Sequence, residues 1–322
     1  MRTARKPVGL AEVLGAALLV LFGLVACVGS PYATGEPRSI AGGGTAGVYY
    51  DYAGRLADAL HGELGLDITA AETHGSVDNL LRVGSGEALL GFAQGDTAAD
   101  AIAGTGGFDE PLPIRAIARV YDEYVHVVVP ADSDAERIRD LTGRTISLGA
   151  ENSGVQVIAT RVLEASAVPL DGIDNPALGL DASIEAMRRG DIDGFFWVGG
   201  LPTPGIERLA SAMRIRLLPI DASTVEQVNA GHAGVYRLAE FPVGIYGIET
   251  PSATMTVPNY LITQVDAPDD LIREVTRVLF ESRAAIAQRV AAAEFLDRRQ
   301  AIFTGPMQLH PGAAEYYVSS RS

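Results

Sequence analysis

The stretch Ser39-Ile-Ala-Gly-Gly-Gly-Thr-Ala-Gly-Val48 decides the fold class of this chain. A short apolar run precedes the glycines, and the residues that follow them, 48–64, repeat leucine at helical spacing. A strand, a tight glycine-rich turn and an amphipathic helix in this order form the start of a βα unit. The same rhythm returns along the chain, which predicts an α/β fold built on mostly parallel sheets flanked by helices.

Further elements follow from periodicity and turn residues. Ser76 is a candidate N-cap for the second helix, which is expected to bury Leu80 and Leu81. Pro258 interrupts a late apolar run and favours an edge strand, or a strand that crosses between domains, over the centre of a sheet. The predicted strands cover residues 39–41, 67–70, 88–93, 114–120, 124–129, 192–198 and 256–263, and the predicted helices cover 48–64, a stretch from 76, 96–103, 153–167, 182–189 and 269–293.

The length of the chain indicates two lobes, because almost 300 residues remain after the N-terminal segment and one core seldom organises so many. An apolar run ends at Pro130 and enters a polar segment, where the chain is expected to leave the first lobe. We therefore assign residues 38–127 plus 255–322 to the first lobe and residues 128–254 to the second. The run with Pro258 is the expected return path.

Residues 1–27 resemble the signal peptide of a bacterial lipoprotein. Basic residues are followed by an apolar run too short to span a bilayer comfortably, and the run ends Leu24-Val-Ala-Cys27. Cys27 is the only cysteine, so a disulfide within the chain is excluded. Lipid attachment is its expected role, and a buried thiol or an uncleaved anchor is the alternative. Residues 28–37 are small, polar and turn-rich, which predicts an extended tether. The protein is therefore expected in the periplasm or at the cell surface, anchored to a membrane through Cys27.

Composition excludes several classes of function. The net charge of −15 argues against nucleic acid as a partner, because phosphate binding needs a basic stripe. Lys6 is the sole lysine, so the exported chain has no lysine for a P-loop or a Schiff base. The five histidines show no metal-binding spacing, and no nucleophile elbow occurs. We expect no metal, no cofactor and no enzymatic activity.

The glycine-rich turn leaves one alternative open. Residues 42–47 fit Gly-x-Gly-x-x-Gly between a strand and a helix, and Glu72 stands where a ribose-binding acid would fall. An exported α/β enzyme that binds a dinucleotide is the rival hypothesis, although nicotinamide cofactors are scarce outside the cytoplasm. The same turn can hold any anion, including a carboxylate, at the helix N-terminus. Similar turns at residues 74–76, 151–154 and 199–203 suggest that several helix N-termini converge on one cleft.

The run Phe195-Phe-Trp197 holds the only tryptophan. Aromatic residues are more often part of the core than of a ligand platform. This run, however, ends a strand beside Gly199-Gly200, and ligands of open α/β sheets bind at such strand ends.

Several stretches together resemble the TAXI family, the extracytoplasmic solute receptors of certain TRAP transporters, through most of the exported chain. They are Gly43-Gly-Thr-Ala-Gly-Val-Tyr-Tyr50, His74-Gly-Ser-Val-Asp-Asn79, Phe92-Ala-Gln-Gly-Asp96, His126-Val-Val-Val129, Phe195-Phe-Trp-Val-Gly-Gly-Leu-Pro-Thr-Pro204 and Leu309-His-Pro-Gly312. The resemblance implies a two-lobed type II periplasmic-binding-protein fold with a hinge of crossing strands. It also implies a receptor that closes on a small carboxylate or amino acid, glutamate-like above all, and delivers it to TRAP-type permease subunits in the membrane.

The resemblance also implies the residues of the binding site. They are Gly44, Thr45, Tyr49, Ser76, Asn79 and Gln94 in the first lobe, and Ser153, Gly154, Trp197, Thr203 and Tyr246 in the second. Amides, hydroxyls and helix N-termini can hold a carboxylate without an arginine. Val155 and Ile245 replace threonines that the family often has, so the identity of the solute stays open. A signalling lipoprotein that keeps the binding fold without transport is a third hypothesis.

Overall fold

Nine strands join into one mixed sheet in the computed structural model, which describes residues 38–232 and 234–320. The strand order is β2-β1-β3-β9-β4-β6-β5, with β7 beside β4 and β8 beside β9. The strands are β1 Arg38–Ala41, β2 Ile68–Ala71, β3 Leu90–Gln94, β4 Ile114–Pro130, β5 Ile146–Ser147, β6 Gly194–Gly199, β7 Ile215–Leu217, β8 Arg237–Phe241 and β9 Ser252–Gln264. Pairs β1–β2, β1–β3 and β5–β6 are parallel, whereas every pair that includes β4 or β9 is antiparallel. The predicted α/β class is confirmed, but the sheet is mixed rather than mostly parallel.

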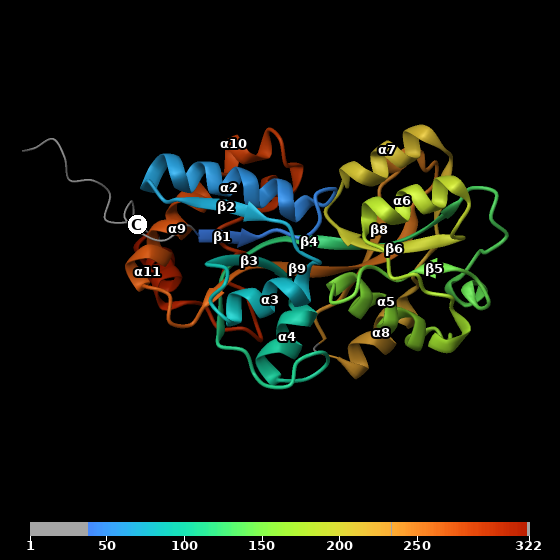
Figure 1. Cartoon of the computed structure of the whole chain (residues 1–322), viewed down its shortest axis with the longest axis horizontal. Helices are drawn as coiled ribbons and strands as arrows, with labels where there is room; N and C mark the ends of the chain where they lie inside the picture. Colours follow the sequence, from blue (N-terminus) through green and yellow to red (C-terminus); the bar gives the residue numbers. More distant parts are fainter. Residues whose placement is uncertain (1–37, 233, 321–322) are drawn as a thin grey trace, which may run out of the picture.

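The helices form two groups, one at each end of the sheet (Figure 1). The helices are α2 Val48–Leu64, α3 Ser76–Gly84, α4 Gly95–Ala103, α5 Gly154–Ala165, α6 Leu180–Arg189, α7 Pro204–Ala212, α8 Ala222–Gly231, α9 Asp269–Glu281, α10 Arg283–Ala287 and α11 Pro311–Ser319, and the 3-10 turns are Ile138–Leu141, Leu170–Gly172, Ile245–Gly247 and Ala291–Phe295. We call β1–β3 with α2–α4 and α9–α11 the first lobe, and β5–β8 with α5–α8 the second lobe.

Strands β4 and β9 run through both lobes. The sequence predicts two strands at 114–120 and 124–129, whereas the structure shows one strand over the whole range. Irregular register between Ala116 and Ala118, and between Arg119 and Tyr121, bends this strand without ending its pairing with β9. The predicted lobe boundaries at 127/128 and 254/255 fall inside the two crossing strands. The division into two units that move separately stays a prediction.

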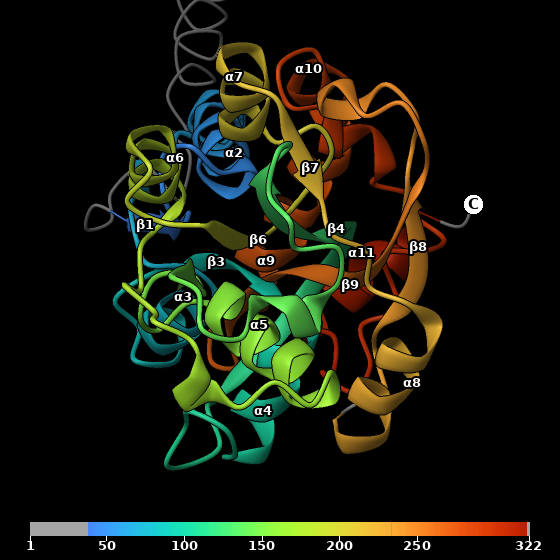
Figure 2. The same cartoon turned by 90° about the vertical axis from the view of Figure 1, so that its right-hand side faces the viewer.

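The core of each lobe lies on both faces of the sheet. Along β4, Val125, Val127 and Val129 pack against α5 and α8, whereas Val128 faces the opposite way and packs with α6 and α7. This alternation follows from the two-residue period of a strand. Figure 2 shows the result in the second lobe, with α6 and α7 on one side of the sheet and α5 and α8 on the other. The first lobe is built likewise, with α2 and α9–α11 on one face and α3 and α4 on the other.

Pro258 is accommodated near the centre of the sheet rather than at an edge. On one side of β9, pairing with β8 reaches Thr256 and pairing with β3 begins only at Asn259. Pro258 therefore falls in the gap between two partner strands, where its missing N–H costs no ladder hydrogen bond on that side. The expectation of a strand that crosses between lobes agrees with this arrangement.

Three local predictions need correction. Gly75 rather than Ser76 is the N-cap of α3, and Leu81 is 42% exposed although Leu80 is buried. The expected helix at 269–293 is broken into α9, α10 and a 3-10 turn. The chain leaves helical geometry at Val290, with φ −125° and ψ 93°, and this turn buries both Val290 and Leu296 in the core of the first lobe.

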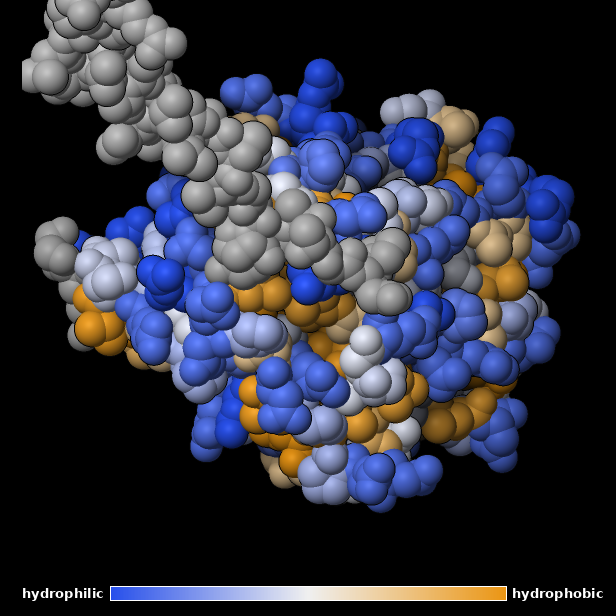
Figure 3. Space-filling model, turned by 60° about the vertical axis from the view of Figure 1, so that its left-hand side comes forward, coloured by the Kyte–Doolittle hydropathy of each residue, from blue (hydrophilic) through white to orange (hydrophobic). Residues whose placement is uncertain are grey.

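The surface seen in Figure 3 is largely hydrophilic, with hydrophobic residues in small groups between the polar ones. This agrees with a net charge of −15. Among residues 38–232 and 234–320, every helix falls short of the length and apolarity that crossing a bilayer requires. The predicted signal peptide, Cys27 and the tether over residues 28–37 lie outside the described residues.

Gly312 allows α11 to touch α9, which gives a stability prediction. A Cβ at Gly312 would lie 2.0 Å from the backbone oxygen of Asp269, at the start of α9. Because backbone must move to admit a methyl group, Gly312→Ala is expected to lower the free energy of unfolding by about 1–3 kcal/mol, measured by urea unfolding. Gly62→Ala is the control, since its Cβ meets nothing within 4 Å and helical alanine is favoured over glycine. Equal stability of Gly312→Ala and the wild type would contradict this packing.

Candidate functional site

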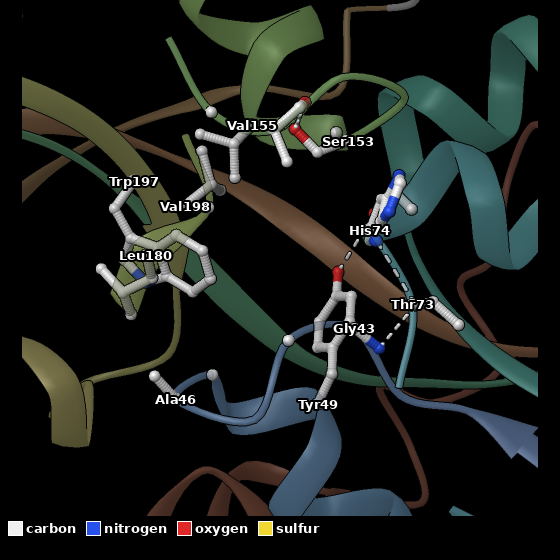
Figure 4. Close-up of a pocket in the computed structure, with 18 of the residues that line it drawn as sticks. Gly43, Ala46, Tyr49, Thr73, His74, Ser153, Val155, Leu180, Trp197 and Val198 are labelled. Atoms are coloured by element: carbon white, nitrogen blue, oxygen red, sulfur yellow. Dashed lines mark hydrogen bonds between the residues drawn. The ribbon is translucent and has the colours of Figure 1, made fainter. Parts of the chain in front are cut away.

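A cavity of about 370 Å³ lies where the two lobes face each other. Figure 4 shows its two walls, with Tyr49 and His74 on one side and the apolar side chains of Leu180, Trp197 and Val198 on the other. The first lobe contributes residues 43–49 and 72–76, together with Gln94 and Glu123 from the sheet, and the second lobe contributes residues 149–150, 153–155, 179–182 and 197–198.

Five helices begin at this cavity. The residues at their N-termini that line it are Gly47 and Val48 of α2, Gly75 and Ser76 of α3, Gln94 before α4, Ser153 and Gly154 of α5, and Gly179 and Leu180 of α6. Ser153 caps α5 by accepting a hydrogen bond from the Gln156 amide, whereas the other four helices have no side-chain cap. Amide dipoles from both lobes therefore point into one space, which favours a negatively charged group there.

The glycine-rich turn is held in place by a buried polar chain. The Gly43 amide donates to Thr73 Oγ1 at 2.8 Å, and Thr73 Oγ1 donates to Asn79 Oδ1 at 2.5 Å. Asn79 Nδ2 in turn donates to the Phe92 carbonyl at 2.8 Å. Asn79 was expected to contact the solute, but it lies behind the cavity wall. Its position in the structure supports Thr73, which does line the cavity.

Eight of the eleven predicted ligand contacts line the cavity: Gly44, Thr45, Tyr49, Ser76, Gln94, Ser153, Gly154 and Trp197. The other three, Asn79, Thr203 and Tyr246, lie outside its lining. Their role as direct contacts would require a different arrangement of the lobes, and the assignment of all eleven stays a prediction.

Thr203 and Tyr246 lie behind Trp197. The Trp197 indole Nε1 donates to Thr203 Oγ1 at 3.2 Å, and the Thr203 amide donates to the Tyr246 hydroxyl at 2.7 Å. His126 Nε2 is 3.3 Å from the same hydroxyl. Burial lowers the pKa of His126 to about 3, so this histidine is neutral at physiological pH. The chain of contacts holds the half-buried Trp197 against the cavity, while Phe195 and Phe196 belong to the core.

Glu123 is a buried acidic residue of the cavity lining that the sequence does not predict as a site residue. Its Oε2 accepts hydrogen bonds from the Tyr49 hydroxyl at 3.0 Å and from Gln94 Nε2 at 2.9 Å, and its Oε1 accepts from the Tyr121 hydroxyl at 3.3 Å. Only 1% of the residue is exposed. Burial raises the pKa of Glu123 to about 8, although the groups that donate hydrogen bonds to its carboxylate act to lower this pKa. An acidic residue in the middle of a run that is otherwise mostly apolar was the available signal.

The cavity carries no strong cation of its own. Among its described lining residues there is no lysine or arginine, and the other two carboxylates, Glu72 and Asp181, are exposed. Nowhere in residues 38–232 and 234–320 do three or more His, Cys, Asp or Glu side chains gather as metal ligands would. Anion binding here would therefore depend on backbone amides and hydroxyls.

A buried ion cluster joins the lobes beside the cavity. Arg161 of α5 contacts Asp96 of α4 at 2.6 Å and also pairs with Asp100. The Tyr236 hydroxyl donates to Asp96 at 2.6 Å, and Asp96 is fully buried. Burial raises the pKa of Asp96, against the opposing effects of Arg161 and Tyr236. We call Arg161, Asp96, Asp100 and Tyr236 the interlobe ion cluster.

Known structures share the fold of this chain. The periplasmic binding protein BugD is 11% identical, with a TM-score of 0.54 over 88% of this chain and 93% of that one. A protein from Bordetella bronchiseptica RB50 is 19% identical, with a TM-score of 0.51 over 88% and 89%. A structure described as a periplasmic transporter is 14% identical, with a TM-score of 0.50 over 88% and 91%. At these identities the likeness concerns the fold, which is that of periplasmic binding proteins.

The sequence itself matches one family description over most of its length. The match spans residues 40–319, which include every strand from β2 to β9 and all of the cavity lining. The chain belongs to the NMT1-like family.

Proposed function

We propose that this protein is an extracytoplasmic solute receptor, not an enzyme, that binds a small organic solute between its lobes and delivers it to a membrane transporter. The observation that carries the proposal is the cavity between the lobes, onto which five helix N-termini converge. A solute that touches both walls would stabilise the closed arrangement, because only contacts made in that arrangement can shift the population toward it.

A carboxylate is the proposed anionic group of the solute. Four of the five helix N-termini lack a side-chain cap, so their first amides are suited to a bound carboxylate. Thr45 and Ser76 add hydroxyls to the same lining. The apolar wall formed by Leu180, Trp197 and Val198 would cover the rest of a small organic molecule.

The membrane partner is proposed to be a TRAP-type permease. The TAXI-like stretches support this choice, among them residues 43–50 and 195–204, which contribute residues to both sides of the cavity. The same proposal includes export, lipid attachment at Cys27, and movement of residues 38–127 plus 255–322 against residues 128–254 about strands β4 and β9.

A thermal-shift screen tests the proposed function. The purified protein is heated with amino acids, mono- and dicarboxylates and nicotinamide cofactors, and a bound solute is expected to raise the melting temperature, because it stabilises the native state alone. At a concentration 100 times its dissociation constant, a solute adds about 2.7 kcal/mol of stability. A shift with nicotinamide cofactors alone would favour the alternative, an exported α/β enzyme that binds a dinucleotide. Turnover of a bound solute would contradict the assignment as a receptor.

A further inference from the structure

Two acceptor groups at the cavity have no cationic partner. Glu123 presents a buried carboxyl group, and Gln94 Oε1 is buried without a hydrogen-bond donor among the described residues. Gln94 Nε2 is engaged by Glu123, so its amide oxygen points away from that contact, toward Gly154 of the second lobe. A buried acceptor without a donor loses its hydrogen bonds to water and gains nothing in return. A ligand that donates hydrogen bonds would satisfy it.

The surroundings of Glu123 also lack positive charge. The groups that face it are Tyr49 from α2, Gln94 from β3, Tyr121 from β4 and Asn259 from β9, and all four are neutral. The cavity therefore combines helix N-termini, which favour an anion, with a carboxyl group and a free amide oxygen, which favour a cationic donor. A solute with only negative groups would leave the carboxyl group of Glu123 and the amide oxygen of Gln94 without a donor.

We propose that Glu123 is a specificity-determining residue that recognises a protonated amine of the solute, with Gln94 Oε1 as the second acceptor. The solute class that fits both sets of groups carries an ammonium group together with its carboxylate. This inference rests on the proposed function, because it names the chemistry of a solute held in the same cavity.

Such recognition has a consequence for protons. With a pKa of about 8, Glu123 holds a proton in the empty protein at pH 6–7, and pairing with an ammonium group requires the ionised form. Binding must therefore release a proton, and the affinity must rise with pH. The affinity is expected to rise by up to about tenfold per pH unit near pH 6, and by less near pH 8, as long as the amine stays protonated.

Isothermal titration calorimetry tests the proposal with the twenty common amino acids, each beside the carboxylic acid that lacks only the amino group. The expected result is that at least one amino acid binds and that its deaminated counterpart binds about tenfold more weakly or worse. Glu123→Gln is expected to lose about tenfold or more in affinity for that amino acid and to bind it without releasing a proton. Proton release is read from titrations in buffers of different ionisation enthalpy.

Glu63→Gln is the matched control, because Glu63 of α2 is exposed and lies outside the cavity lining. It is expected to bind as the wild type does, with the same proton release. Thermal unfolding of Glu123→Gln shows whether the variant is folded. If folded Glu123→Gln binds the amino acid like the wild type, or if deaminated acids bind as tightly as amino acids, the proposal is wrong while the receptor function stands. If no compound of either kind binds, this inference is wrong, and the thermal-shift screen with the other solutes decides the receptor function separately.

Discussion

Arg161→Met is expected to lower the free energy of unfolding by about 3–5 kcal/mol, the range typical of removing one member of a buried ion pair. Arg161 is 7% exposed and pairs with two carboxylates of the other lobe, of which Asp96 is fully buried. Methionine fills similar space but leaves both aspartates without a counter-charge. Urea unfolding of the purified variant measures the change.

Arg82→Met is the matched control for this prediction. Arg82 also contacts two carboxylates, Asp78 and Glu87, each at 2.7 Å, but its side chain is 32% exposed. Water screens such pairs, so the control is expected to lose no more than about 1 kcal/mol. Adding Asp96→Asn to Arg161→Met should restore part of the loss, because it removes a buried charge. Equal losses in the two arginine variants would show that the interlobe ion cluster contributes no more than a surface pair.

Gly154→Ala is expected to weaken solute binding by about 100-fold, which corresponds to the upper half of a 1–3 kcal/mol packing penalty. A Cβ at Gly154 would lie 1.8 Å from Gln94 Oε1 and 2.9 Å from Ser76 Cβ, and both neighbours belong to the opposite lobe. The Gln94 side chain cannot rotate away without losing the hydrogen bond from its Nε2 to Glu123. The added methyl group would therefore hold the lobes apart, against the proposed closure around a solute.

The fold of Gly154→Ala should stay intact, because its obstacle lies between the lobes and not inside either core. Gly54→Ala is the control, since a Cβ at Gly54 of α2 meets nothing within 4 Å. Calorimetry with the solute that gives the largest thermal shift is expected to show nearly wild-type affinity for the control. Wild-type affinity in Gly154→Ala itself would mean that the lobes do not close as the structure has them.

Local periodicity was sufficient to predict most of the elements. The helix at 48–64 has the bounds that the sequence predicts, because its leucines are regularly spaced and glycines flank both ends. The interruption after α9 was not predictable in the same way. The apolar period continues through Ile286 and Val290, and these residues are buried, but they reach the core through a change of chain direction. Tertiary packing decides such a turn, and periodicity alone does not show it.

The candidate site was predictable only where it lies in turns with a distinctive composition. The glycine-rich turn and Ser153-Gly154 were found because helix starts have recognisable residues. Glu123 was missed because residues 121–123 were interpreted as a break between two strands, whereas β4 continues through them. Thr203 and Tyr246 line no part of the cavity and act through Trp197, a relation that depends on contacts 43 residues apart in the chain. Such contacts leave no local pattern.

The two crossing strands also determine the order in which this protein can complete its folding. Leu90 of β3 pairs with Thr263 of β9, so the sheet of the first lobe is completed by a segment that follows the whole second lobe in the chain. Bringing together two strands so far apart in the chain costs conformational entropy before any contact forms, and this slows folding. Until that strand arrives, the edge of β3 lacks its native neighbour, and an unpaired edge invites pairing with other chains. A chain that stops anywhere in the second lobe would therefore leave both lobes incomplete.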